Sequence, residues 1–183
     1  MTPAQLATLK AAILADPALA AYPAGSDGAF GLAAALNLPA SPAFAVWTQV
    51  SSDVVFDAIS WDKFTPTDAP DTTQIYANRI LSIQTKQMNL QTMLFRDKID
   101  GRKAKIRAAL RDAVIALPSG AVGAAVTAGG ESGATVLTAL TRNATVAEKI
   151  LITSSPTTGN VTAGLMGFEG TINYQDVEAA RAS

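Results

Sequence analysis

Alanine makes up a large share of the apolar residues in this chain, and this limits the core that the chain can build. Hydrophobic residues account for 49% of the 183 residues, whereas aromatic residues account for only 6%. Burial stabilises a fold by roughly 25 cal/mol per Å² of apolar surface, and an alanine side chain offers little surface to bury. We therefore expect a thin core of closely packed helices that completes its burial against a neighbouring molecule.

Apolar residues recur at helical spacing along most of the first 152 residues. The first helix has clear end signals, because Thr2 and Gln5 have the spacing of a capping box, Pro3 occupies the first helical position, and Asp16 and Pro17 stop the pattern. Further helices are expected over residues 26–36, 53–59, 72–95, 100–117, 134–141 and 145–152, the last of them beginning at a second capping-box pair, Thr145 and Glu148.

The pattern changes near the C-terminus. Residues 154–164 are rich in Thr, Ser and Gly, which is the composition of a linker. Apolar residues then alternate with polar ones over residues 166–174, which predicts a half-buried strand, and a short helical turn is expected over residues 176–181. This strand needs a partner, either residues 44–47 or a neighbouring subunit.

Together these patterns predict a mostly α fold. We expect a helical bundle with a small β element over residues 1–152 and an extended C-terminal docking tail over residues 153–183. The docking contacts, to a partner or to other copies of the chain, are predicted at four residues of the tail: Phe168, Ile172, Tyr174 and Val177.

Positive charge is concentrated in residues 96–112. This segment holds seven basic and three acidic residues, a net charge of +4, whereas the rest of the chain holds seven basic and twelve acidic residues, a net charge of −5. Such a segment is typical of a solvated helix face, of contact with a phosphate backbone, or of contact with an acidic protein surface, and all three interpretations stay open. The residues predicted to make the contact are Arg102, Lys103, Lys105, Arg107 and Arg111.

Several observations argue against an enzyme. Histidine and cysteine are both absent, which removes the commonest general base, the soft metal ligands and the strongest nucleophile. Asp53 and Asp57 have the spacing to share a helix face, but the sequence does not show the contrasting environments that general acid–base catalysis needs. Asp68 and Asp71 lack the pattern of a calcium-binding loop, and the glycines of residues 120–133 lack a following Gly-Lys-Ser/Thr. We expect no catalytic, metal-binding or cofactor-binding residues; an enzyme using carboxylates or a Ser-Lys pair is the remaining alternative.

The sequence also indicates where the protein works. The first residues do not look like a secretion signal, and no apolar run is long enough to span a bilayer, so a soluble protein without membrane contact is expected. The absence of cysteine fits a reducing compartment.

A set of sequence stretches spread over nearly the whole chain is informative when taken together. They are MTPAQL and ILADP within residues 1–17, PAFAVW over 42–47, residues 77–94, RAALRDA over 107–113, RNATVAEK over 142–149 and FEGTINYQDVEAAR over 168–181. These stretches resemble a family of virion proteins encoded by tailed bacteriophages, and the ending is the most specific part of the likeness.

The resemblance implies a structural virion protein, assembled in the host cytoplasm, and the residues fit a head-to-tail adaptor best. Such adaptors are helical bundles that form a homo-oligomeric ring beneath the portal, which implies a dodecamer, and their extended C-terminal segments grip the portal. The implied partners are portal and tail proteins, with packaged DNA as a further non-specific contact. The alternatives are another virion component (a tail terminator, a tail protein or a capsid decoration protein) and a cytosolic protein that binds nucleic acid non-specifically.

Overall fold

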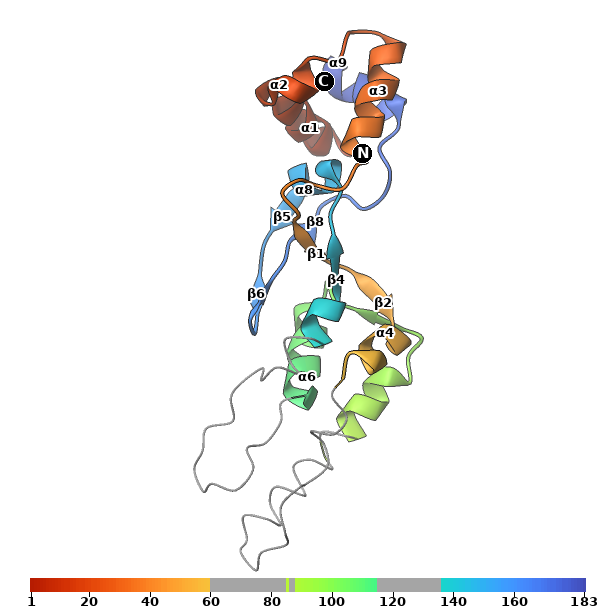
Figure 1. Ribbon diagram of the computed structural model, residues 1–183, viewed down its shortest axis with the longest axis vertical. Helices are drawn as coiled ribbons and strands as arrows, with labels where there is room; N and C mark the ends of the chain where they lie inside the picture. The colour runs from red at the N-terminus through yellow and green to blue at the C-terminus, as the bar shows by residue number, and fades with distance from the viewer. Residues whose placement is uncertain (60–84, 86–87, 115–135) are drawn as a thin grey trace, which may run out of the picture. The chain divides into compact units, whose positions relative to one another are not determined.

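The computed structural model describes residues 1–59, 85, 88–114 and 136–183. The chain divides into two compact units, each built from segments that are distant in sequence (Figure 1). Unit 1 contains residues 1–46, 142–156 and 163–183, and unit 2 contains residues 47–141 and 157–162. This division differs from the predicted one at residue 152, because the C-terminal segment belongs to the same unit as the N-terminal helices.

Helices form the core of unit 1. Helix α1 (Pro3–Ala15) begins at the predicted capping box, in which the Thr2 hydroxyl accepts a hydrogen bond from the Gln5 N–H and the Gln5 side chain accepts one from the Thr2 N–H. Helices α2 (Pro17–Ala20), α3 (Ser26–Leu36) and α9 (Tyr174–Ala182) complete the group, and α9 packs against α1 and α3 (Figure 1). The shared core contains Leu9, Ile13, Leu19, Ala29, Leu32, Ala33, Leu36, Ala147, Ile172, Val177 and Ala180.

The C-terminal segment is part of this core. Ile172 is 2% exposed and Val177 is fully buried, while Phe168 and Tyr174 pack against the same cluster. Asn37, at the end of α3, holds the segment with two hydrogen bonds: its Nδ2 donates to the Ile172 carbonyl at 2.8 Å, and its Oδ1 accepts from the Ile172 N–H at 2.9 Å. Ile172 and Val177 therefore have no surface left for docking, which corrects the role predicted for them, because the thin core of unit 1 uses these side chains itself.

The C-terminal segment also finds its β partners within unit 1. Strand β5 (Ile152–Ser154) pairs antiparallel with β8 (Leu165–Met166). Val46 forms a parallel bridge with Gly164, whose N–H donates to the Ala45 carbonyl at 2.9 Å. Gly164 precedes the predicted strand, so the observed strand partner is β5 and neither of the two predicted ones. The predicted strand over 166–174 is shortened to β8, because the chain turns at residues 167–173 to reach Asn37 and α9.

An ion pair between the partly exposed Arg142 and the buried Glu148 holds helix α8 (Val146–Ile150) in unit 1. Glu148 is 2% exposed and accepts hydrogen bonds from Arg142 Nη2 at 2.6 Å, Arg142 Nη1 at 2.7 Å and the Thr145 N–H at 2.9 Å, the last of which belongs to the predicted capping box. Burial raises the pKa of Glu148, but the hydrogen bonds from Arg142 and Thr145 outweigh it, so the pKa lies below its ordinary value.

Unit 2 combines short strands with helices. Strand β2 (Gln49–Ser51) is followed by helix α4 (Ser52–Asp57) and pairs antiparallel with β3 (Lys98–Asp100). Residues 88–94 are helical, α6 (Ala104–Val114) follows β3, and β6 (Thr157–Thr158) and β7 (Val161–Thr162) form a hairpin. Its fully or almost fully buried apolar side chains include Trp47, Val55, Leu90, Ile99, Leu110, Val114, Val136, Leu137 and Leu140.

The predicted helical bundle is wrong. In the part of the chain that the structure describes, helices alternate with short two-stranded sheets: β2 with β3, β5 with β8, β6 with β7, and β1 (Ala45–Trp47) with β4 (Thr141–Asn143). The predicted helix over 100–117 begins only at Ala104, because residues 98–100 pair with β2. Long-range strand pairing therefore overrides the local helical pattern at these positions.

Gly101 allows this change from strand to helix. Its N–H donates to the Thr48 carbonyl at 2.9 Å, and a Cβ at this position would lie 2.7 Å from the Thr48 oxygen and 2.8 Å from the Leu140 Cβ. Any larger residue would separate the segments that meet here.

The predicted helix over 72–95 is observed at residue 85 and at residues 88–94, and its other residues lie outside the described part of the chain except for Phe95, which follows the helix end. The Asp68 and Asp71 pair and the glycines of residues 120–133 also lie outside the described residues.

Substitution of Asn37 tests the link between α3 and the C-terminal segment. Asn37→Ala leaves both backbone groups of Ile172 without their partner, and we expect a loss of about 2 kcal/mol in the free energy of unfolding. Urea titration followed by far-ultraviolet circular dichroism measures the loss. Asn89→Ala, at an exposed helical position, is the matched control; equal midpoints for both variants would refute the link.

The Glu148 pair gives the stability of unit 1 a defined pH dependence. A carboxylate whose pKa is lower in the folded state stabilises the fold above its unfolded pKa, and this contribution disappears as the pH falls through the folded pKa. At pH 7 the free energy of unfolding of the wild type is expected to exceed that of Glu148→Gln by about 2 kcal/mol, because the lost hydrogen bonds join charged groups. This gap narrows below pH about 4. A gap that stays constant between pH 7 and pH 3 in urea titrations contradicts the assignment.

Candidate functional site

The basic segment was predicted to face a partner, but Arg107 lies inside unit 2. It is 2% exposed, and its guanidinium lies 4.6 Å from the centre of the Trp47 ring. Its Nη1 donates to the carbonyls of Gly101 at 2.7 Å and Arg102 at 3.0 Å, and its Nε donates to the Thr158 hydroxyl at 3.0 Å. Burial lowers the pKa of Arg107. This cation therefore joins α6 to the β6–β7 hairpin and is not available to a partner.

The spacing along α6 explains why Arg107 turns inward. It precedes the buried residues Leu110 and Val114 by three and seven positions, so all three lie on one face of the helix. Ile106, the apolar residue next to Arg107 in the sequence, is only half-buried.

Asp100 neutralises part of the remaining charge. The Arg102 guanidinium binds it at 2.7 Å through Nε and at 3.2 Å through Nη2, and Lys103 Nζ lies 3.8 Å from its second oxygen. The side-chain hydrogen bond from Arg102 lowers the pKa of Asp100 more than burial raises it. Of the five cations predicted for the contact, Arg102 and Lys103 are thus exposed but engaged with Asp100, and Lys105 is exposed.

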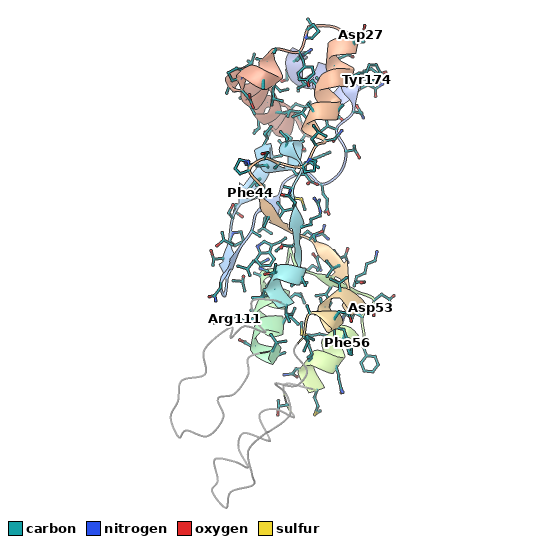
Figure 2. All side chains as sticks on the ribbon, viewed as in Figure 1. Asp27, Phe44, Asp53, Phe56, Arg111 and Tyr174 are labelled. Atoms are coloured by element: carbon teal, nitrogen blue, oxygen red, sulfur yellow. The ribbon has the colours of Figure 1, made fainter. Side chains whose placement is uncertain are left out.

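Arg111 is neither fully buried like Arg107 nor exposed like Lys105. It is half-buried in the last turn of α6 (Figure 2), and a Cβ added at Gly159 in the β6–β7 turn would lie 3.7 Å from its Cδ. Its Nε is buried and has no hydrogen-bond partner among the described residues. The five cations do not therefore form one continuous surface.

Three exposed cations, Arg96, Lys98 and Lys103, line a groove of about 440 Å³ in unit 2. Ile99, Ile106 and Met93 supply its apolar lining, and its charged lining residues are Arg96, Lys98, Lys103 and Asp100; Gln49 and Thr92 complete it. We call this the basic groove. It is formed by the β2–β3 sheet, the end of the helix at residues 88–94 and the start of α6.

Arg96 and Lys98 were not among the predicted contact residues, yet they are the groove's available cations. Both are exposed, and neither makes an ion pair with another described residue. The alternation of Lys98, buried Ile99 and Asp100 is the period-two signal that would have placed these residues on a strand. The groove thus has surplus positive charge above an apolar lining, which suits a ligand that carries both acidic and apolar groups.

The other predicted chemical features are accounted for as follows. Asp53 and Asp57 both lie on α4 and are exposed. Across residues 1–59, 88–114 and 136–183, no cluster of three or more acidic side chains is arranged to hold a metal ion. Within the same described part of the chain, no helix has both the length and the apolar character needed to cross a membrane.

No protein-family model, curated protein or solved structure matches this chain. The basic groove is accordingly assigned from its own geometry and charge.

The burial of Arg107 predicts that it stabilises unit 2. Arg107→Ala removes hydrogen bonds to two carbonyls and the contact with Trp47, and we expect a loss of about 3 kcal/mol in the free energy of unfolding. Urea titration followed by tryptophan fluorescence measures this loss. Lys105→Ala, an exposed cation on the same helix, is the control and should change stability by less than about 0.5 kcal/mol. Similar effects for the two variants would show that Arg107 is not a structural residue.

Proposed function

We propose that this chain is a structural protein of a tailed-phage virion, a head-to-tail connector that assembles by binding an acidic protein surface in the basic groove. The groove is the observation that carries the proposal, because it places Arg96 and Lys98, without carboxylate partners among the described residues, beside an apolar lining. Protein interfaces commonly combine these two features, with an apolar centre and a polar rim.

The distribution of the cations favours a protein partner over DNA. Arg107 is buried, and Arg102 and Lys103 share Asp100, which leaves Arg96, Lys98 and Lys105 as the exposed cations of the segment without an ion pair to a described residue. Three phosphate contacts would give a salt dependence with a slope of only about −3, which is weak compared with proteins that make 6–10 such contacts. The apolar lining would also have no counterpart on a phosphate backbone.

The resemblance to phage virion proteins supports the location that we propose. Its most specific stretch, residues 168–181, forms part of the core of unit 1 and the helix α9. That stretch is therefore part of the folded core of unit 1. The connector proposal accordingly rests on the basic groove and does not require a C-terminal tail that grips the portal.

Electron microscopy tests the proposed function. The purified chain is mixed with the portal protein of the same phage, and particles are compared with those of the portal alone. We expect additional ring-shaped density at the face of the portal that receives the tail, following the symmetry of the ring. Portal particles without added density, at micromolar concentrations of both proteins, would overturn the connector proposal.

A further inference from the structure

We propose that the acidic surface bound by the basic groove belongs to a second copy of this chain, namely the outer face of α3 and α9 in unit 1. This inference rests on the proposed function, because it identifies the occupant of the same groove. We define the α3–α9 face by four residues: Asp27, Phe30, Tyr174 and Glu178.

These four residues form one continuous surface. Phe30 and Tyr174 stack with their ring centres 4.3 Å apart. One turn before Phe30 on α3, the Ser26 hydroxyl donates at 3.3 Å to Glu178, which lies one turn after Tyr174 on α9. Asp27 lies three residues before Phe30, and Glu178 lies four residues after Tyr174, so each acidic residue shares a helix face with an aromatic one. Figure 2 shows Asp27 and Tyr174 on the same side of unit 1.

The face exposes both apolar surface and negative charge. Phe30 is 55% exposed although it is a large hydrophobic residue, and Tyr174 is half-buried beside it. Asp27 and Glu178 are exposed, and neither makes an ion pair with another described residue. A partly exposed aromatic pair beside carboxylates is the chemical complement of a groove that combines an apolar lining with Arg96 and Lys98.

The charge of the two units is also complementary. Unit 1 contains four basic and six acidic residues, and unit 2 contains ten basic and nine acidic residues. A contact between unit 1 of one copy and unit 2 of the next therefore joins units of opposite net charge, −2 and +1. Such a contact uses two different surfaces, so every copy keeps one of each free for a further neighbour, and repetition produces a ring or a filament.

The size of the two surfaces predicts that one contact is weak. A standard interface uses about 20–30 residues on each side, and neither the groove nor the face approaches this number. A single pair of copies should therefore dissociate at low concentration. Closure of several contacts into one assembly raises the effective concentration and stabilises it.

Charge exchange between the two surfaces tests the contact. Arg96→Glu with Lys98→Glu makes the groove acidic, and Asp27→Lys with Glu178→Lys makes the face basic. Each double variant alone is expected to associate at least tenfold more weakly than wild type in analytical ultracentrifugation at tens of micromolar. An equimolar mixture of the two should recover association, because each reversed surface then meets its complement on the other variant.

Matched variants separate charge at these surfaces from charge in general. Lys105→Glu and Asp112→Lys change exposed residues of α6 that lie outside both surfaces, and each should associate as wild type does. Circular dichroism of every variant verifies folding, and Asp27→Asn with Glu178→Gln provides a neutral version of the face that should also weaken association. Because the Debye length shrinks to about 3 Å in 1 M salt, high salt should weaken wild-type association.

The outcomes distinguish this inference from the connector proposal. Wild type that stays monomeric both alone and with the portal, or a mixture of the two double variants that fails to recover association, overturns the inference. If the groove variant (Arg96→Glu with Lys98→Glu) self-associates as wild type does but no longer binds the portal, the groove binds the portal and only this inference fails. If the variants behave as expected but wild type never binds the portal, the inference stands and the connector proposal fails. Tight duplex DNA binding that the groove variant abolishes, without self-association, also overturns the inference.

Discussion

The burial of Arg107 determines how unit 2 presents its charge. Its guanidinium lies against Trp47 and donates to two carbonyls and the Thr158 hydroxyl, so three segments of the unit meet at one side chain. A buried guanidinium is tolerated only when its donors are satisfied and its plane packs against a suitable surface. With Arg107 inside, Arg96, Lys98 and Lys103 are the cations that line the groove, which is therefore the surface of unit 2 with surplus positive charge.

Unit 1 is organised by a different constraint, the shortage of large apolar side chains. Its helices contribute several alanines to the core, and the missing volume comes from Ile172 and Val177, more than 130 residues later in the chain. Asn37 then satisfies the backbone of Ile172, which would otherwise be buried without partners. The neighbour expected to complete the thin core is in this case the C-terminal segment of the chain itself.

Features set by local chemistry could be predicted. The capping boxes at Thr2 and Thr145 and the stop at Asp16 involve residues a few positions apart, and the structure confirms all three. The candidate site could be predicted only in part. The clustering of positive charge is visible in the sequence, but sequence alone could not show that Arg107 points inward, since its burial depends on packing against Trp47 and Thr158.

The amino-acid sequence by itself determined where most helices begin, which segment carries the positive charge, and that the apolar surface available for burial is small. Only the tertiary structure decided that residues 98–100 form a strand, that the C-terminal segment joins the N-terminal helices, and which cations reach the surface. The reason is physical: helix caps and helical periodicity act within one or two turns, whereas strand pairing and core packing depend on residues that meet only after the chain has folded.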